Sequence, residues 1–213
     1  MHYKRTLALG LLVAWCIALL FLRIARSGSL AYTFLVWNLF LALAPAVAAM
    51  VLARTRTVWL QLALAALWLA FLPNAPYIVT DLLHLRARPP VPLWFDVALL
   101  VSFATTGLLL GYISLSDVQR VAAKRFGQLT SWLGAVFVLF LSGFGIYLGR
   151  FLRWNSWQVV TEPMALLADI ARRVVDPFAH PRTLAVTAVY GCGLVVGYVV
   201  FRMLFVYHSP THE

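Results

Sequence analysis

The chain has 213 residues, of which 63% are hydrophobic and 11% are charged, and its formal net charge is +10. A soluble domain contains roughly 45–50% apolar and about 25% charged residues, so this composition excludes one soluble core as the place for so much apolar side chain. The basic residues lie in short groups between apolar segments, which suits anionic lipid headgroups and argues against a nucleic-acid partner. Cys16 and Cys192 lie in apolar segments outside any CxxC motif, so we expect small buried thiols rather than a disulfide or a metal site.

Apolar segments of sufficient length to cross a bilayer recur along the chain, and they predict an all-α transmembrane helix bundle that forms a single integral membrane domain, residues 1–213. The predicted spans are residues 7–22, 30–52, 58–72, 93–115, 130–148 and 184–206. The first would measure only roughly 24 Å at about 1.5 Å per residue, so its flanks must contribute. A signal peptide is the alternative for this segment, but Arg23 and Arg26 lie between its apolar core and any cleavage site.

The third span runs into an unusual stretch, FLPNAPYIVTDLLHL, at residues 71–85. Pro73 and Pro76 each remove a backbone donor and disfavour helix at the residue before them, so a Pro-broken segment is predicted after this span. Asn74 tolerates turn geometry and can satisfy freed backbone groups, and Tyr77 follows directly after the second proline. Asn74 and Tyr77 are therefore candidate ligand-binding residues, since broken backbone at membrane depth is covered by protein or lines a cavity.

Beyond the break, Thr80 is expected to cap a short helix that begins at Asp81, which would place Asp81 and His84 on one face at i and i+3. Three interpretations stay open. The span could end at Pro73, with both groups in a solvated interfacial turn; the two could form a catalytic or binding site at the membrane surface; or a broken helix could line a transport path. Two candidate ligands do not make a zinc site, so no metal is predicted.

Asp96 lies early in the fourth predicted span, within PLWFDVALL. A carboxylate near a helix N-terminus is favoured by the helix dipole and can stay solvated. An ionisable group placed deeper in the membrane is costly and usually functional. Asp96 is therefore either a solvated first-turn acid or a third candidate catalytic group beside Asp81 and His84.

The stretch GRFLRWNSW, residues 149–157, follows the fifth span. Arg150 and Arg153 could be cations that end a helix and extend to the headgroups. They could instead form an anion pocket with Trp154 and Asn155, because guanidinium groups bind phosphate and carboxylate well. These four residues are candidate ligand-binding residues.

The connection between the fifth and sixth spans contains an amphipathic pattern over residues 162–176. Thr161 is expected to cap this helix, and Asp176-Pro177 to end it. Its apolar stripe predicts an interfacial helix that lies on the membrane surface or covers the bundle. Binding of a partner protein is the alternative.

With six spans, the loops after the third and fifth spans emerge on the same side of the membrane. We therefore predict that Arg150 or Arg153 pairs with Asp81 or Asp96, because an unpaired charge near apolar surroundings is costly. Asn38, inside the second span, is expected to join this group or to form an interhelical hydrogen bond.

The orientation of the chain depends on its Lys and Arg residues, which are shared almost evenly between the two sides. If Arg150 and Arg153 serve a site, and Arg172 and Arg173 lie on a surface helix, these four arginines are left out of the count. The side of the membrane that carries both termini is then the more basic. The sequence then predicts cytoplasmic termini.

Residues 71–85, the Trp-Phe-Asp of residues 94–96, and YLGRFLRWNSW at 147–157 together resemble the bacterial membrane family known as domain of unknown function 1361. The resemblance covers most of the chain and implies a multi-pass protein of the bacterial inner membrane. It implies no reaction, because none is assigned to the family. The family pattern continues with an acidic residue after the NSW, where this chain has Gln158, which argues against a role that needs a carboxylate there.

The leading interpretation is an integral membrane protein of unassigned activity, with a polar site at one membrane interface that binds a small anion or a lipid headgroup. As an enzyme, it would use His84 for proton transfer, Asp81 to orient it, and Arg150 and Arg153 to hold negative charge. The alternatives are a small-solute or proton-coupled transporter and an accessory subunit of an envelope complex. The sequence specifies the lipid bilayer as a partner, but it specifies no substrate, cofactor or oligomeric state.

Overall fold

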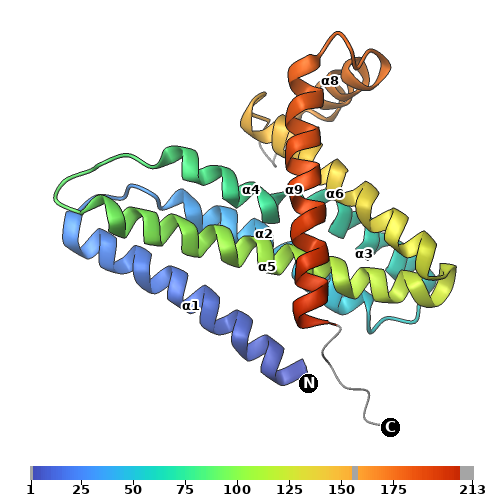
Figure 1. Ribbon diagram of the computed structural model, residues 1–213, viewed down its shortest axis with the longest axis horizontal. Helices are drawn as coiled ribbons and strands as arrows, with labels where there is room; N and C mark the ends of the chain where they lie inside the picture. Colours follow the sequence, from blue (N-terminus) through green and yellow to red (C-terminus); the bar gives the residue numbers. More distant parts are fainter. Residues whose placement is uncertain (1, 155–157, 207–213) are drawn as a thin grey trace. The chain divides into compact units, whose positions relative to one another are not determined.

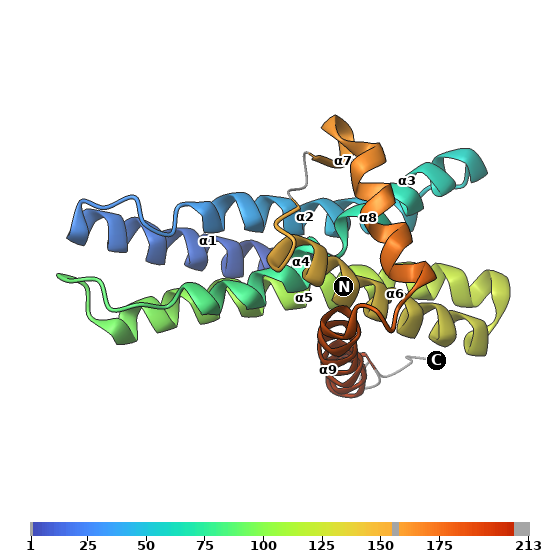
Figure 2. The same cartoon turned by 90° about the horizontal axis from the view of Figure 1, so that it is seen from above.

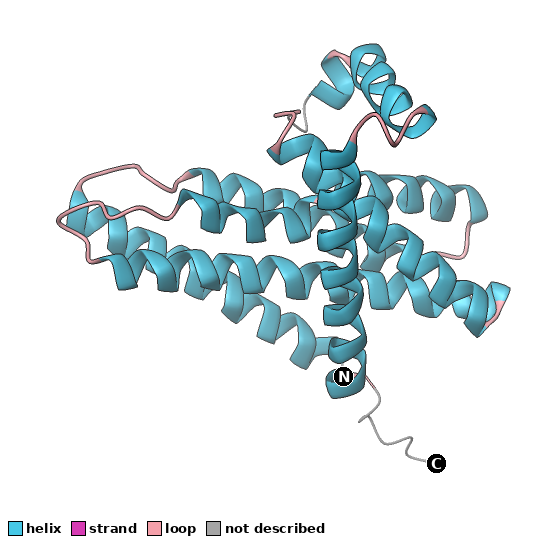
Figure 3. Ribbon diagram, turned by 45° about the horizontal axis from the view of Figure 1, so that its top comes forward, coloured by secondary structure: helices cyan, strands magenta, loops and turns pink. Residues whose placement is uncertain are grey.

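The computed structural model describes residues 2–154 and 158–206, and within these ranges the chain folds into helices joined by loops (Figure 3). The helices are α1 (His2–Ser27), α2 (Phe34–Leu52), α3 (Val58–Phe71), α4 (Asn74–Tyr77), the 3-10 helix η1 (Ile78–His84), α5 (Leu93–Phe126), α6 (Gln128–Arg150), α7 (Gln158–Thr161), α8 (Pro163–Val175) and α9 (Pro181–Phe205). The predicted all-α class is confirmed.

Among the described residues, six helical segments are long and apolar enough to cross a membrane, in agreement with the six predicted spans. They are Lys4–Ser27, Phe34–Leu52, Val58–His84, Leu93–Phe126, Gln128–Arg150 and Pro181–Phe205. The third segment is longer than predicted, because α3, α4 and η1 follow one another with only Leu72 and Pro73 between α3 and α4. The chain therefore has the organisation of a multi-pass membrane protein.

The chain forms two compact units, which divide within α5, between Val118 and Gln119. Unit 1 contains α1 to η1 and most of α5, and unit 2 contains the end of α5 together with α6 to α9. The single membrane domain expected from the sequence stays a prediction.

In unit 1, α1, α2 and α5 lie side by side (Figures 1 and 2). Their shared core consists of fully or almost fully buried side chains, including Cys16, Leu35, Leu99 and Phe103. Large apolar side chains such as Phe40 remain exposed on the outer faces of these helices. A helix that is apolar on all sides suits a position with protein on one face and lipid on the other.

In unit 2, α6 and α9 cross where Gly143 meets Gly191. A Cβ atom at Gly143 would lie 2.9 Å from the backbone nitrogen of Gly191 and 2.9 Å from the backbone oxygen of Thr187. The two helix backbones are therefore in contact, which is the arrangement that small residues permit between membrane helices.

Candidate functional site

The segment after α3 is interrupted at Leu72 and Pro73, which form a turn, and then resumes as α4 and η1, so that Pro76 lies within a short helix. Pro73 and the residue before it, Leu72, both have right-handed helical backbone angles. The Nδ2 of Asn74 donates to the carbonyl of Phe71 at 3.1 Å, and so supplies a donor to a carbonyl at the end of α3. The amide of Tyr77 donates to the carbonyl of Pro73 at 3.1 Å. The prolines therefore divide the span into shorter helices without ending it.

This segment is held directly against α5. A Cβ atom at Gly107 would lie 2.6 Å from the carbonyl oxygen of Ala75 and 2.9 Å from the Ile78 side chain. Only glycine permits so close an approach of α5 to α4 and η1. The position of η1, and of the polar residues that it carries, depends on this contact.

Asp81 and His84 lie on one face of η1, because side chains three residues apart are eclipsed in a 3-10 helix. The Asp81 residue is only 1% exposed, and its Oδ2 accepts a hydrogen bond of 2.7 Å from Nδ2 of Asn38 in α2. Its Oδ1 lies 3.7 Å from Nδ1 of His84, whose side chain is 43% exposed. The carboxylate is thus buried, while the imidazole reaches the surface.

Two sequence expectations about this segment are wrong. Thr80 does not begin a helix at Asp81, since η1 begins at Ile78 and the Thr80 hydroxyl donates back to the carbonyl of Tyr77 at 2.7 Å. Asp81 is not in a solvated turn, because α2 and α5 cover η1. The expected interhelical hydrogen bond from Asn38 is confirmed.

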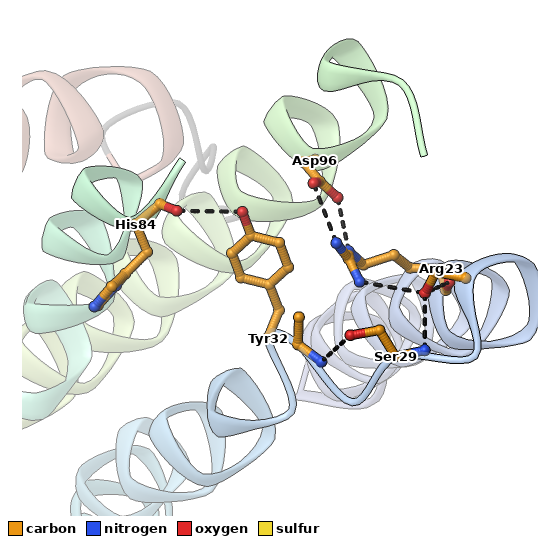
Figure 4. A network of polar contacts seen from close by, with 7 residues as sticks. Arg23, Ser29, Tyr32, His84 and Asp96 are labelled. Atoms are coloured by element: carbon orange, nitrogen blue, oxygen red, sulfur yellow. Dashed lines mark hydrogen bonds and ion pairs between the residues drawn. The ribbon is translucent and has the colours of Figure 1, made fainter. Parts of the chain in front are cut away.

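Tyr32, in the loop between α1 and α2, joins His84 to a second polar cluster (Figure 4). Its hydroxyl donates to the His84 carbonyl at 3.2 Å. Its buried ring lies 4.7 Å from the Arg23 guanidinium and 4.8 Å from that of Arg88, both measured to the ring centroid. Tyr32 has a φ of 70°, a left-handed conformation that is uncommon for a bulky residue. Two cation–π contacts and a hydrogen bond offset the cost of that conformation.

Arg23 of α1 and Asp96 of α5 form a buried ion pair at the same end of unit 1. Nε lies 2.8 Å from Oδ1 and Nη2 lies 3.3 Å from Oδ2, and the two side chains are 1% and 0% exposed. The interpretation of Asp96 as a solvated first-turn acid is therefore wrong. Within unit 1, Asp96 has Arg23 as its ionic partner. The predicted pairing of Arg150 or Arg153 with Asp81 or Asp96 joins residues of the two units and stays a prediction.

A second ion pair, between Arg5 and Asp117, joins the start of α1 to the last residues of α5 that belong to unit 1. The two arginines are about 18 residues apart and the two aspartates about 21, which correspond to roughly 27 and 32 Å of helix. The hydrocarbon core of a bilayer is about 30 Å thick. The two ion pairs are therefore spaced like the two boundaries of a membrane, with Asp81 and His84 at the boundary marked by Arg23 and Asp96.

Three further arginines lie on the segments at the His84 end of unit 1, in α1 and in the loop after η1: Arg26, Arg86 and Arg88. Arg26 and Arg86 are exposed and Arg88 is half-buried. Among the described residues, none of the three has a carboxylate within ion-pair distance. This end of unit 1 therefore combines a half-exposed imidazole with excess positive charge.

The remaining candidates lie in unit 2, at the end of α6. Arg150 is the last residue of α6, and Arg153 is exposed with a φ of 61°. Trp154 donates from Nε1 to Oδ2 of Asp169 in α8 at 2.9 Å. Asn155 lies outside the described residues. The anion pocket expected from these residues stays a prediction.

Sequence reasoning missed Arg23 and Tyr32. Arg23 follows directly after an apolar run and resembles an ordinary flanking cation. One available signal was the similar spacing of Arg5 and Arg23 on one helix and of Asp96 and Asp117 on an antiparallel one. The conformation of Tyr32 had no signal in the sequence.

The family model described as "Protein of unknown function (DUF1361)" matches residues 37–196, which is well over half of the chain. The chain belongs to this family. The matched region contains Asp81, His84 and Asp96, whereas Arg23 and Tyr32 precede it. No match was found among curated proteins or among solved structures.

Proposed function

We propose that this DUF1361 protein binds a small anion or an anionic lipid headgroup at one membrane interface, through the end of unit 1 that carries His84. We further propose that it resides in the bacterial inner membrane with both termini in the cytoplasm. The His84 end of unit 1 would then face the periplasm, because α1 crosses the membrane once before it.

The observation that carries this proposal is the pairing of a buried carboxylate with a half-exposed imidazole. Asp81 is held by Asn38 at 2.7 Å and faces Nδ1 of His84. A carboxylate beside one ring nitrogen favours a proton on that nitrogen and orients the ring. His84 can then contact a ligand from the surface and exchange a proton with it.

The surrounding charge specifies the ligand class. Arg26, Arg86 and Arg88 are without ion-pair partners among the described residues, as shown above, so an anion that reaches His84 meets uncompensated positive charge. Guanidinium groups bind phosphate and carboxylate oxygens through paired hydrogen bonds. A lipid phosphate and a free phosphate would satisfy this chemistry equally.

The distribution of charge along unit 1 supports interfacial binding over transport by this unit. Asp, Glu, Lys, Arg and His do not occur in residues 6–22, 34–52, 58–80 or 97–116. Proton relays and coupled transport use ionisable groups inside the membrane. In unit 1 such groups occur only at the two ends of the spans.

The proposal can be tested by NMR on protein with labelled histidine, reconstituted in phosphatidylcholine nanodiscs. His84→Ala identifies the His84 resonance by its loss. We expect that resonance to shift on addition of inorganic phosphate, of phosphatidylglycerol in the nanodisc, or of both. A shift with phosphate alone identifies a soluble anion, and a shift with phosphatidylglycerol alone identifies a headgroup.

The double variant Arg86→Ala/Arg88→Ala should weaken the response at least tenfold in probe concentration. The matched control is Arg54→Ala/Arg56→Ala, which removes two exposed arginines from the α2–α3 loop at the other end of unit 1 and should leave the response unchanged. A His84 resonance that responds to neither probe, in protein with an unchanged unfolding midpoint, would overturn the proposal. An equal loss in both double variants would overturn it as well, because it would indicate general charge screening.

A further inference from the structure

Helix α8 in unit 2 is amphipathic, and its longest apolar stripe is exposed. In a surface helix of a soluble protein the apolar stripe faces the core. In α8 most apolar side chains are exposed, and the inward side combines the polar Asp169 and Arg173 with the half-buried Leu166 and Ile170. Met164 is 76%, Val175 84% and the following Phe178 85% exposed.

The polar contacts of α8 centre on Asp169. Its Oδ2 accepts the hydrogen bond from Trp154, and its Oδ1 lies 2.6 Å from Nη2 of Arg172 and 3.1 Å from Nη1 of Arg173. The guanidinium of Arg173 also lies 6.0 Å from the ring centroid of Tyr147 in α6. Asp169 and Arg173 thus connect α8 to the end of α6, and the exposed apolar stripe lies on another side of the helix.

The outward stripe is continuous along the helix. Its members recur at helical spacing and are all exposed: Met164, Leu167, Ala171, Val174 and Val175. A contiguous exposed apolar surface of this kind marks a contact with another apolar phase or partner.

The position of α8 in the chain indicates that its exposed apolar stripe contacts the lipid bilayer. The helix lies between two membrane spans, α6, which ends at Arg150, and α9, which begins at Pro181. Five residues separate its end at Val175 from α9, so it remains at the level where α9 enters the bilayer. Figures 1 and 2 show α8 crossing the direction of α9, which Figure 2 presents end-on. A helix that lies across a membrane span lies along the membrane surface.

We propose that the apolar stripe of α8 inserts into the interfacial region of the lipid bilayer, with the helix lying in the membrane plane. Between Glu162 and Asp176 the segment carries three carboxylates and two guanidiniums, a net charge of −1. Attraction to anionic lipid therefore does not drive the contact, and burial of apolar side chains does. The depth of α8 is accordingly independent of the charge of the headgroups.

Spin labels at single cysteines test this proposal on the full chain in nanodiscs. The background carries Cys192→Ser, since Cys192 is exposed and Cys16 is buried. Labels are placed by Leu167→Cys and Val175→Cys on the stripe, and by Arg172→Cys at its polar edge, where the Arg172 side chain is 70% exposed. Collision rates with oxygen, which concentrates in lipid, are compared with those of a water-soluble nickel chelate.

We expect oxygen collisions to exceed nickel collisions severalfold at positions 167 and 175, and the reverse at position 172. The values should agree between phosphatidylcholine nanodiscs and nanodiscs containing phosphatidylglycerol. Preferential nickel collisions at 167 and 175 would overturn the proposal, since the stripe would then face water. Immobile labels that meet neither reagent would overturn it in favour of a second copy of the chain, and a contact present only with phosphatidylglycerol would contradict the apolar mechanism.

Discussion

Asp81 and Asp96 are two buried carboxylates at the same end of unit 1, and they differ in what they face. Asp96 is closed on both oxygens by the Arg23 guanidinium. Asp81 has an amide on one oxygen and an imidazole beside the other, and that imidazole reaches the surface. Burial alone therefore does not identify a functional acid in this protein. The partner of the carboxylate distinguishes the two cases. The buried guanidinium of Arg23 neutralises Asp96, whereas the half-exposed His84 connects Asp81 to the surface, where a ligand can bind.

The largest loss of stability should come from breaking the buried ion pair between Arg23 and Asp96. Arg23→Met leaves Asp96 buried without its cation, and removal of one partner of a buried ion pair costs about 3–5 kcal/mol in the free energy of unfolding. The double variant Arg23→Met/Asp96→Leu should recover most of that loss, since it leaves no buried charge. Unfolding in detergent measures both, and a cost below about 1 kcal/mol for the single variant would contradict the assignment of a closed, charged pair.

A smaller loss of stability should come from displacing η1, which carries Asp81 and His84. Gly107→Ala places a Cβ against the Ala75 carbonyl, so α4 and η1 must shift, at a cost of about 1–3 kcal/mol. The same variant should alter the His84 resonance, because Asp81 and His84 are carried on η1. Gly10→Ala is the matched control, since a Cβ there has nothing within 4 Å. Equal stability of the two variants would show that the close approach at Gly107 is not required.

The hydrogen bond between the Tyr32 hydroxyl and the His84 carbonyl should contribute less to stability. Tyr32→Phe removes the donor to the His84 carbonyl but keeps the ring against Arg23 and Arg88, so we expect a loss of about 1 kcal/mol. Tyr190→Phe serves as the control, because the Tyr190 hydroxyl donates to none of the described residues. An unfolding free energy that falls equally in both variants would show that the hydrogen bond from Tyr32 to His84 does not contribute to stability.

A smaller change still is expected from Arg5→Met. This variant repeats the chemistry of Arg23→Met on the same helix, but the side chains of Arg5 and Asp117 are 33% and 7% exposed, against 1% and 0% for Arg23 and Asp96. Partly solvated ion pairs contribute about 0–1 kcal/mol, so the loss should be several times smaller than that of Arg23→Met. Similar losses at both ends would show that burial does not distinguish the two ion pairs.

The third carboxylate of interest, Asp169, lies outside the membrane spans and should report on pH. The hydrogen bond from Trp154 lowers the pKa of Asp169, with Arg173 and Arg172 acting in the same direction. A carboxylate whose pKa is lowered by folding stabilises the folded state above its unfolded pKa of about 3.9, and this contribution is lost as the pH falls through the lower folded pKa. We expect a spin label at position 175 to become mobile only below about pH 4, and at a higher pH in Trp154→Phe. Identical pH profiles would exclude the indole as the cause.

The spans and the amphipathic helix could be predicted because each depends on local composition and periodicity. The short helix α4 around Pro76 could not, because local preference disfavours it and packing against Gly107 overrides that preference. The same holds for η1, whose 3-10 geometry replaces the short capped helix expected at Asp81. In each case a contact with a distant helix decides the local conformation.

The candidate site was predictable only in part. The spacing of Asp81 and His84 indicated a shared face, and the polar Asn38 within an apolar span indicated an interhelical hydrogen bond. The pairing of Arg23 with Asp96 joins residues 73 positions apart, and one sequence does not say which cation meets which acid. Tyr32 was missed because its role depends on a backbone conformation that tyrosine seldom adopts.

The conformation of Tyr32 has a practical consequence for work on this protein. The connection between α1 and α2 contains Gly28 and Ser29 and is largely exposed, so it resembles a suitable place for an epitope tag or a protease site. Yet its last turn fixes Tyr32 against two guanidiniums and the carbonyl of His84, and Ser29 itself accepts a backbone hydrogen bond from Ala31. An inserted sequence there would disturb the His84 end of unit 1, whereas the exposed residues around Arg54, between α2 and α3, offer a more tolerant position for topology reporters.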